Sequence, residues 1–382
     1  MPVLLSCYVI ALPFAIGIIG KSFIVADIFL LLLIGVSFYN FLLRGGFRAN
    51  PADAGFLLLI AASLAGKHVL AEPEAFAFEL ASLIFMYVGA RVIAARIDRR
   101  KKLEKLFNFI ASLTMVLLSV STLIIFFRHF GEVGLTKSFF SVYGNFKGLF
   151  NYTNQMAILL VCFWPFFITR LSDKPFFKLF WYFIVFSVTV SIGSRSGFWV
   201  IFLQTALIEL MPFRRKKVSK VFLRFGSLIA VVALTISLLA TDSGLQRSLG
   251  DAGTGPRSSN VLRVKNFREA LNSAPDWLRG YGLGCFDQTH VHEVHNTPFS
   301  VLVETGVVGF MAFIAIFAFY ALKFYRSSEI EELPNLKFAL SLAWLGLISM
   351  GMFHYLLRNR SVWLIVALTI AFITLQAEPQ NE

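Results

Sequence analysis

The chain has 382 residues, of which 57% are hydrophobic and only 15% are charged. Soluble domains are about 45–50% apolar and about 25% charged, so this composition excludes an ordinary soluble protein. A formal net charge of +13 would suit a nucleic-acid partner in a soluble chain. Here the basic residues gather in short loops beside apolar runs, as they do in the cytoplasmic loops of membrane proteins, and we expect no nucleic-acid partner.

Apolar runs long enough to cross about 30 Å of hydrocarbon recur along the whole chain. They predict an all-α polytopic membrane protein with about twelve transmembrane helices. The N-terminal run has no basic leader and no small-residue cleavage site, so we interpret it as a retained first span. The predicted spans are 2–19, 22–43, 54–71, 76–95, 106–127, 153–170, 176–193, 197–213, 221–240, 298–322, 336–358 and 361–378.

The spans divide the chain into three parts. Residues 1–240 carry predicted helices 1–9, residues 241–297 form one long polar loop, and residues 298–382 carry helices 10–12. The loop is predicted to contain an amphipathic helix that ends near Pro275, before the glycine-rich turn 280–284. This helix is indicated by four apolar residues at helical spacing, Val261, Val264, Phe267 and Leu271.

The most basic loops set the predicted orientation. They lie at 96–105 and 214–220, and four predicted spans separate them. Positive-inside bias therefore places both in the cytoplasm, together with both termini. The long loop 241–297 then faces the opposite, outer side.

Arginines reach this outer side from two distant parts of the chain. Arg195 lies at the span-to-span turn 193–197, where it can bind a substrate phosphate or satisfy helix-terminal carbonyls and lipid phosphate. Arg263 lies on the apolar face of the predicted loop helix, although a solvated basic face or a lipid headgroup contact is the alternative. Arginine suits pyrophosphate because its planar fork donates two parallel charge-assisted hydrogen bonds.

Three histidines stand at the end of the loop. The spacing of His290, His292 and His295 lacks the helical i, i+4 pair of zinc sites, and the three cysteines are dispersed, so we expect neither a metal nor another cofactor. We interpret His290 and His292 as structural. His295 is followed by Asn296 and by Pro298, which suits the first turn of a helix. A neutral imidazole at that position can accept a proton from a hydroxyl.

Several ionisable residues fall inside or beside predicted spans. Lys67 and His68 are predicted near the outer end of the third span, where they could line a phosphate site. Together with Glu79 they are also candidates for the pathway of a transporter. Single acidic residues of the same kind are Asp27, Glu209 and Glu304.

The histidine motif continues as Asn296, nine residues, and then Gly306-x-x-Gly309, where the glycines predict close helix packing. The run from His295 resembles the histidine motif of the O-antigen ligases. Their superfamily also contains O-antigen polymerases and protein O-oligosaccharyltransferases.

The resemblance extends to about residues 145–320, in family order. It takes in GSRSG around Arg195, Arg263 with the following aromatic residue and LRGYGLGCF, and GLFNYTNQMA, which holds Asn154. Phe267 stands where the family usually has tryptophan, and the proline before the glycine turn is displaced. Arg257 therefore remains a second candidate for the loop arginine.

The resemblance implies a GT-C-type glycosyltransferase that needs no metal and works at the periplasmic face of the bacterial inner membrane. Its donor would be a glycan on undecaprenyl pyrophosphate, and its acceptor a hydroxyl of lipid A–core. His295 would be the general base, and Arg195 and Arg263 would bind the pyrophosphate and stabilise its developing charge. The remaining substrate-binding candidates are Arg257, Asn154, Asn296 and Lys67.

Three alternatives stay open. A polymerase would use the same chemistry on another lipid-linked glycan, but the full histidine motif and the single large outer loop favour the ligase. A transporter would need ionisable residues near mid-membrane and paired broken helices. A non-catalytic assembly scaffold is the third. The expected partners are the lipid-linked donor, lipid A–core and membrane lipids.

Overall fold

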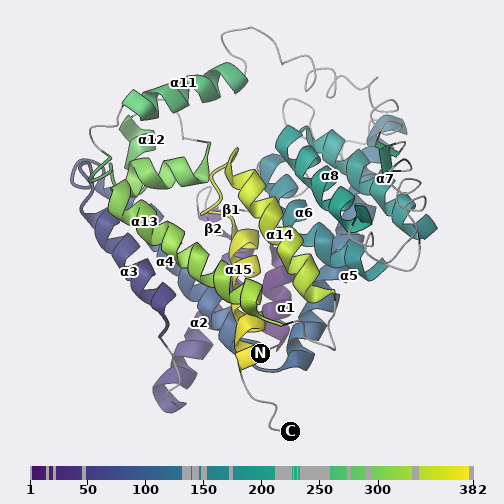
Figure 1. Cartoon of the computed structure of the whole chain (residues 1–382), viewed down its shortest axis with the longest axis horizontal. Coiled ribbons are helices and arrows are strands. Elements are labelled where there is room, and N and C mark those ends of the chain that lie inside the picture. Colours follow the sequence, from purple (N-terminus) through teal and green to yellow (C-terminus); the bar gives the residue numbers. More distant parts are fainter. Residues whose placement is uncertain are drawn as a thin grey trace. The chain divides into compact units, whose positions relative to one another are not determined.

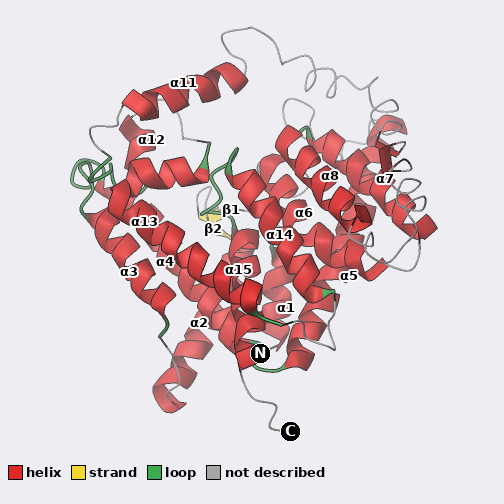
Figure 2. Cartoon of the chain, viewed as in Figure 1, coloured by secondary structure: helices red, strands yellow, loops and turns green. Residues whose placement is uncertain are grey.

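The described part of the chain is almost entirely helical (Figure 2). A two-stranded antiparallel pairing, β1 (Gly17–Ile19) with β2 (Phe23–Ile24), is the exception. The computed structural model describes residues 2–13, 17–19, 23–44, 49–130, 139, 146–147, 153–171, 175–210, 226, 228–229, 231–232, 259–272, 277–289, 295–328 and 335–377.

The chain folds into two compact units, and each is described by itself. Unit 1 comprises Met1–Leu30, Lys101–Ala252 and Glu329–Met350. Its elements are α1 (Pro2–Ala11), α5 (Arg100–Phe130), α6 (Thr153–Ile168), the short η2 (Thr169–Leu171), α7 (Pro175–Ile192), α8 (Arg195–Leu210) and α14 (Leu336–Gly351) (Figure 1).

Unit 2 comprises Leu31–Arg100, Gly253–Ser328 and Gly351–Glu382. The boundary between the units falls inside α2 (Val25–Arg44). The other elements of unit 2 are α3 (Pro51–Leu64), α4 (Pro73–Arg96), α11 (Ser259–Asn272), α12 (Cys285–Thr289), α13 (Thr297–Arg326) and α15 (Arg360–Ala377) (Figure 1).

In unit 1, α6 forms the centre and packs against α7 and α8. All its side chains from Met156 to Ile168 are buried. Polar side chains tie it to its neighbours: Trp164 Nε1 donates to Thr205 Oγ1 at 3.1 Å, and Gln204 Nε2 donates to the carbonyls of Val161 and Leu342 at 3.0 and 2.9 Å. Side-chain bonds of this kind hold helices together where the surroundings are apolar.

Unit 1 also contains a buried ion pair. Lys178 Nζ lies 3.3 Å from Glu209 Oε1, and Tyr182 donates its hydroxyl to the same oxygen at 2.5 Å. Glu209, which the sequence offers as a single intramembrane acid, is therefore paired with a cation that the hydropathy pattern does not reveal. A buried carboxylate needs such partners because isolated burial of its charge is costly.

In unit 2, α3 packs along α13 and α4 packs along α15. Glycine permits the close approach of the first pair, because a Cβ on Gly55 would lie 3.0 Å from Ile316 Cγ1 and one on Gly309 would lie 3.2 Å from Ala62 Cβ. The predicted role of Gly309 in close helix packing is thereby confirmed.

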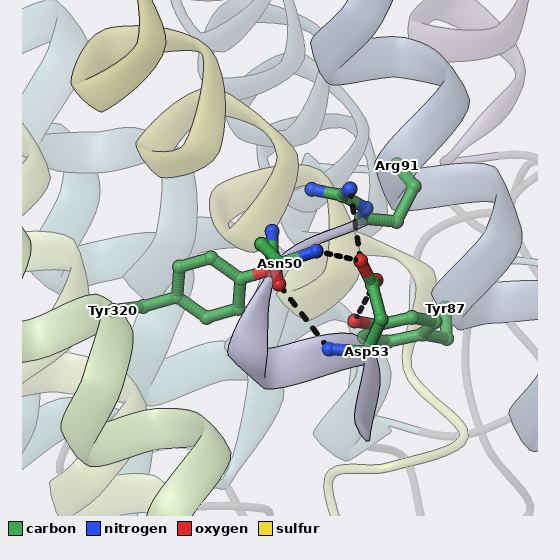
Figure 3. A network of polar contacts seen from close by, with 5 residues as sticks. All are labelled: Asn50, Asp53, Tyr87, Arg91 and Tyr320. Atoms are coloured by element: carbon green, nitrogen blue, oxygen red, sulfur yellow. Dashed lines mark hydrogen bonds and ion pairs between the residues drawn. The ribbon is translucent and has the colours of Figure 1, made fainter. Parts of the chain in front are cut away.

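A polar network joins α3, α4 and α13 at one end of unit 2 (Figure 3). Asn50 caps α3 in a capping box with Asp53. The Asp53 carboxylate also accepts from Tyr87 Oη at 2.7 Å and from Arg91 Nη2 at 3.2 Å, and Asn50 Nδ2 reaches Tyr320 Oη at 3.5 Å. These contacts fix the ends of the three helices relative to one another.

By length and composition, four of the described helices can cross a membrane: α4, α5 over Arg100–Phe127, α6 with η2, and α13. The described apolar helices of 10–17 residues are Val25–Tyr39, Pro51–Leu64, Phe176–Ile192, Leu336–Gly351 and Arg360–Gln376. The chain is thus an α-helical membrane protein, as predicted. The number of twelve spans, the GT-C architecture, the orientation and the three-part division stay predictions.

Three predicted spans end earlier in the structure, and one of them, 336–358, is described below with the candidate site. The first, 2–19, stops at Ala11, because Leu12 precedes Pro13 and the residue before a proline disfavours helix. The third, 54–71, stops at Leu64 and is followed by a turn over residues 65–72. The predicted loop helix is present as α11. Most of the predicted ninth span, 221–240, lies outside the described residues.

Candidate functional site

The start of α13 carries the histidine motif. His295 is exposed on a bend, and Asn296 is the N-cap of the helix, with its side chain accepting from the Phe299 amide at 2.9 Å. The Asn296 amide group also donates from Nδ2 to the Met352 carbonyl at 3.1 Å. Asn296 therefore fixes the backbone beside His295 through both ends of its side chain. Its predicted role in substrate binding stays a prediction.

The segment between α14 and α15, residues 352–359, is bound to the same helix start. Buried Thr297 donates from Oγ1 to the His354 carbonyl at 2.6 Å and accepts from the Leu356 amide at 2.9 Å. The predicted span 336–358 is therefore too long, because α14 ends at Gly351. The residues that follow are apolar enough to extend the hydropathy signal, and only their backbone bonds show that they are a loop.

Helix α13 is interrupted at Gly306, whose φ of 70° and ψ of −178° are not helical. The Val303 and Glu304 carbonyls instead accept from the Tyr281 and Gly282 amides at 3.0 and 2.7 Å. Backbone groups freed by such a break need partners, since unpaired ones are costly in an apolar medium. A Cβ on residue 306 would also lie 2.7 Å from the Leu278 carbonyl oxygen. Gly306 thus permits a break, which corrects its interpretation as a packing glycine.

The turn after α3 joins this arrangement. The amides of Lys67 and His68 donate to the carbonyls of Gly280 and Tyr281 at 2.9 and 3.0 Å. The His68 ring stacks on Tyr281, with centroids 4.8 Å apart and planes 15° from parallel. The Lys67 side chain is exposed. Lys67 is therefore held, through its backbone, on the glycine-rich turn that closes the break in α13.

Aromatic contacts attach α11 to the beginning of α13. The Phe267 ring lies 4.7 Å from that of Phe299, and the Trp277 ring meets Phe299 edge-on at 5.5 Å. Trp277 also donates from Nε1 to the Ala270 carbonyl at 3.2 Å. Arg263 precedes Phe267 by about one helical turn. The helix that carries the predicted loop arginine is thus anchored four residues after His295.

A charged pair that the sequence interpretation missed lies at the same end of unit 2. Arg358 Nε is 2.7 Å from Glu79 Oε2, and the guanidinium carbon lies 5.1 Å from the Tyr355 ring centroid. A Cβ on Gly284, which has a φ of +71°, would be 2.5 Å from Glu79 Cγ. Arg358 was assigned to a span. The signal that could have found it is the pair of arginines, 358 and 360, at the end of an apolar run.

The thiol of Cys285 lies among acidic neighbours on the glycine-rich turn. Burial, followed by the nearby charges of Glu304 and Glu72, raises the pKa of Cys285 to about 11. The thiolate is the reactive form of cysteine, so this thiol is a poor nucleophile near neutral pH.

The predicted site residues fall into three groups. Lys67, His295 and Asn296 all belong to unit 2: Lys67 is bound through its backbone to the turn 277–284, and His295 and Asn296 stand at the start of α13. We call the turns 65–72 and 277–284, the start of α13 and the loop 352–359 together the His295 end. Arg195 is the exposed first residue of α8, and Asn154 is half-buried near the start of α6. Both belong to unit 1, whose placement relative to unit 2 is not determined.

The loop arginines are less fully described. Arg263 lies in α11, and nothing is described of its side chain; Arg257 lies outside the described residues, as do His290 and His292. In the part of the chain that the structure describes, no three His, Cys, Asp or Glu side chains gather as metal ligands would.

No protein-family model matches the chain, and no curated protein matches it.

Proposed function

We propose that this chain is an O-antigen ligase. It would transfer a glycan from undecaprenyl pyrophosphate to a sugar hydroxyl of lipid A–core at the periplasmic face of the bacterial inner membrane. The observation that carries the proposal is that each residue of the histidine motif has a distinct structural position. His295 is exposed, Asn296 fixes the helix start beside it, Gly306 permits the helix break and Gly309 packs against α3.

The proposed reaction is a single displacement. The acceptor oxygen attacks the anomeric carbon of the donor while the carbon–oxygen bond to pyrophosphate breaks, and that electron pair leaves with the pyrophosphate. His295 takes the hydroxyl proton as the new bond forms, which is worth about 10²–10⁴-fold in rate. Attack from the face opposite the leaving group inverts the anomeric centre.

The remaining candidate residues bind the substrates, and the arginines among them bind the leaving group. Arg195 and Arg263 would bind the pyrophosphate, with Arg257 as the alternative loop arginine, and Lys67 and Asn154 would contact the substrates. Pyrophosphate is already a good leaving group, so the protein mainly needs to orient the reactants and to place positive charge near the developing anion.

A transporter is the second candidate, because α13 is broken and Glu304 lies two residues before the break. Transporters place such discontinuous helices at their substrate sites. A polymerase remains the alternative within the same chemistry, with another lipid-linked glycan as the acceptor.

One reconstitution tests these functions. Purified protein receives lipid-linked O-antigen and lipid A–core, with His295→Ala and the neighbouring His292→Ala assayed in parallel. We expect glycan on lipid A–core, lost with His295→Ala and retained with His292→Ala. Longer lipid-linked chains without capped core would identify a polymerase. Movement of the lipid-linked glycan across a vesicle membrane, without His295-dependent transfer, would identify a transporter.

A further inference from the structure

The loop 352–359 brings one arginine, Arg358, to the His295 end of unit 2. We propose that Arg358 is a further binding residue for the anionic pyrophosphate head of the lipid-linked donor, and that Glu79 is the positioning residue that orients it. This inference rests on the proposed function. It adds to the site a loop that the histidine motif does not include.

Position is the first support. Asn296 and Thr297, the two residues after His295, bind the backbone of the loop at Met352, His354 and Leu356. The loop therefore cannot move independently of the histidine's backbone. Arg358 follows Leu356 by two residues.

The orientation of the guanidinium is the second support. Glu79 holds Nε at 2.7 Å, and the Tyr355 ring lies 5.1 Å from the guanidinium carbon. Glu79 in turn packs against the glycine-rich turn at Gly284. The guanidinium of an arginine carries its N–H donors in one fixed plane, so the contacts with Glu79 and Tyr355 set the direction of the whole fork. A fork held in this way is pre-organised for a bidentate contact with a phosphate group.

Exposure is the third support. The Glu79 side chain is 11% exposed, whereas the Arg358 side chain is 38% exposed. The carboxylate is thus the inner partner, and the guanidinium is the part of the pair that reaches the surface. The exposed part of the guanidinium can therefore meet an anion at the surface of unit 2.

The proposal predicts different effects for the two members of the pair. Arg358→Gln removes the positive charge and should weaken donor binding by about tenfold to a hundredfold, as expected for charge-assisted hydrogen bonds. Glu79→Gln keeps a hydrogen-bond acceptor for Nε and removes the competing negative charge. Its donor binding should be unchanged or tighter. If the pair only joins α4 to the loop, the two variants should behave alike. Both would then bind the donor more weakly, or both would bind it as the parent does.

The experiment measures binding of undecaprenyl pyrophosphate to the full chain in detergent, with undecaprenol as the neutral control lipid. Arg91→Gln is the matched control, because it breaks the Arg91–Asp53 ion pair at the opposite end of α4. We expect Arg91→Gln to lower the unfolding temperature without changing binding. Arg358→Lys, which keeps the charge without the fork, should bind between the parent and Arg358→Gln.

Two results would overturn the proposal: parental binding by Arg358→Gln, or equal weakening by Arg358→Gln and Glu79→Gln at similar unfolding temperatures. The readout is independent of catalysis. Weaker binding by Arg358→Gln alone, in a protein that transfers no glycan, would refute the ligase and leave the anion site standing. Glycan transfer by Arg358→Gln with parental affinity for the donor would refute the anion site and leave the ligase standing.

Discussion

The Thr297 hydroxyl bridges two backbone groups of another segment: it donates to the His354 carbonyl at 2.6 Å and accepts from the Leu356 amide at 2.9 Å. A single buried side chain, two residues after His295, thus fixes the loop between α14 and α15 on the start of α13.

Replacing Thr297 tests this bridge. Thr297→Val keeps the shape and removes both hydrogen bonds, leaving a buried carbonyl and amide without the hydroxyl. We expect a loss of about 1–3 kcal/mol in unfolding free energy, together with reduced glycan transfer. Thr297→Ser retains the hydroxyl and should stay close to the parent. Equal behaviour of the two variants in thermal unfolding would show that the hydroxyl is unimportant.

The break at Gly306 gives a second prediction. Gly306→Ala places a Cβ 2.7 Å from the Leu278 carbonyl oxygen at a φ of 70°. We expect destabilisation of about 1–3 kcal/mol or more from backbone strain and loss of transfer. Gly35→Ala is the control, because, apart from its chain neighbours and its own helix backbone, no atom of the described residues lies within 4 Å of its added Cβ. That variant should be neutral or stabilised by up to about 1 kcal/mol. A neutral Gly306→Ala would argue against the break.

The Asp53 network gives a third prediction. Asp53→Asn removes the negative partner of Arg91, whose side chain is only 12% exposed. We expect a loss of about 1.5–3 kcal/mol for the charge-assisted contact. A double-mutant cycle with Arg91→Gln should show strong coupling, since the two side chains share one interaction. Additive effects of the two substitutions would mean that the ion pair contributes nothing.

The Cys285 thiol gives a pH dependence. Its pKa is raised from 9.0 to about 11, so folding favours the protonated thiol. This stabilisation is fully present below about pH 9 and is lost as the pH rises through 11. Alkylation of Cys285 by iodoacetamide, followed by mass spectrometry, should be slow at pH 8 in the folded protein and fast in denaturant. Rapid alkylation at pH 8 without unfolding would contradict the raised pKa.

Removal of metal gives the last prediction. The H-x-H-x-x-H spacing of residues 290–295 does not suit a helical zinc site. We therefore expect any glycan transfer by the purified protein to be unchanged by EDTA. A clear loss of activity, restored by added divalent metal, would return the three histidines to consideration as ligands.

Sequence patterns predicted the features that depend on local composition. The apolar runs gave the helical membrane fold, helical spacing gave α11, and Pro298 after Asn296 gave the start of α13. The break at Gly306 was missed because its cause is distant: residues 277–282 supply the partners that a continuous helix would not need.

The Arg358–Glu79 pair was missed for a related reason. Hydropathy averages over a window, so the apolar residues 352–357 outweighed one arginine and extended the predicted span. The two partners are 279 residues apart in the sequence. Only the packing of the loop against α4 brings them together.

Nine residues stand between Asn296 and Gly306, so ten residue-to-residue steps separate the helix start from the break. At about 1.5 Å per residue these steps set the break about 15 Å from the helix start along the helix axis. Deleting one residue between them would turn the histidine by about 100° around the helix axis relative to the break. The spacing within the motif therefore sets both the distance and the angle between the helix start and the break, in addition to the contacts that Thr297 and Phe299 make.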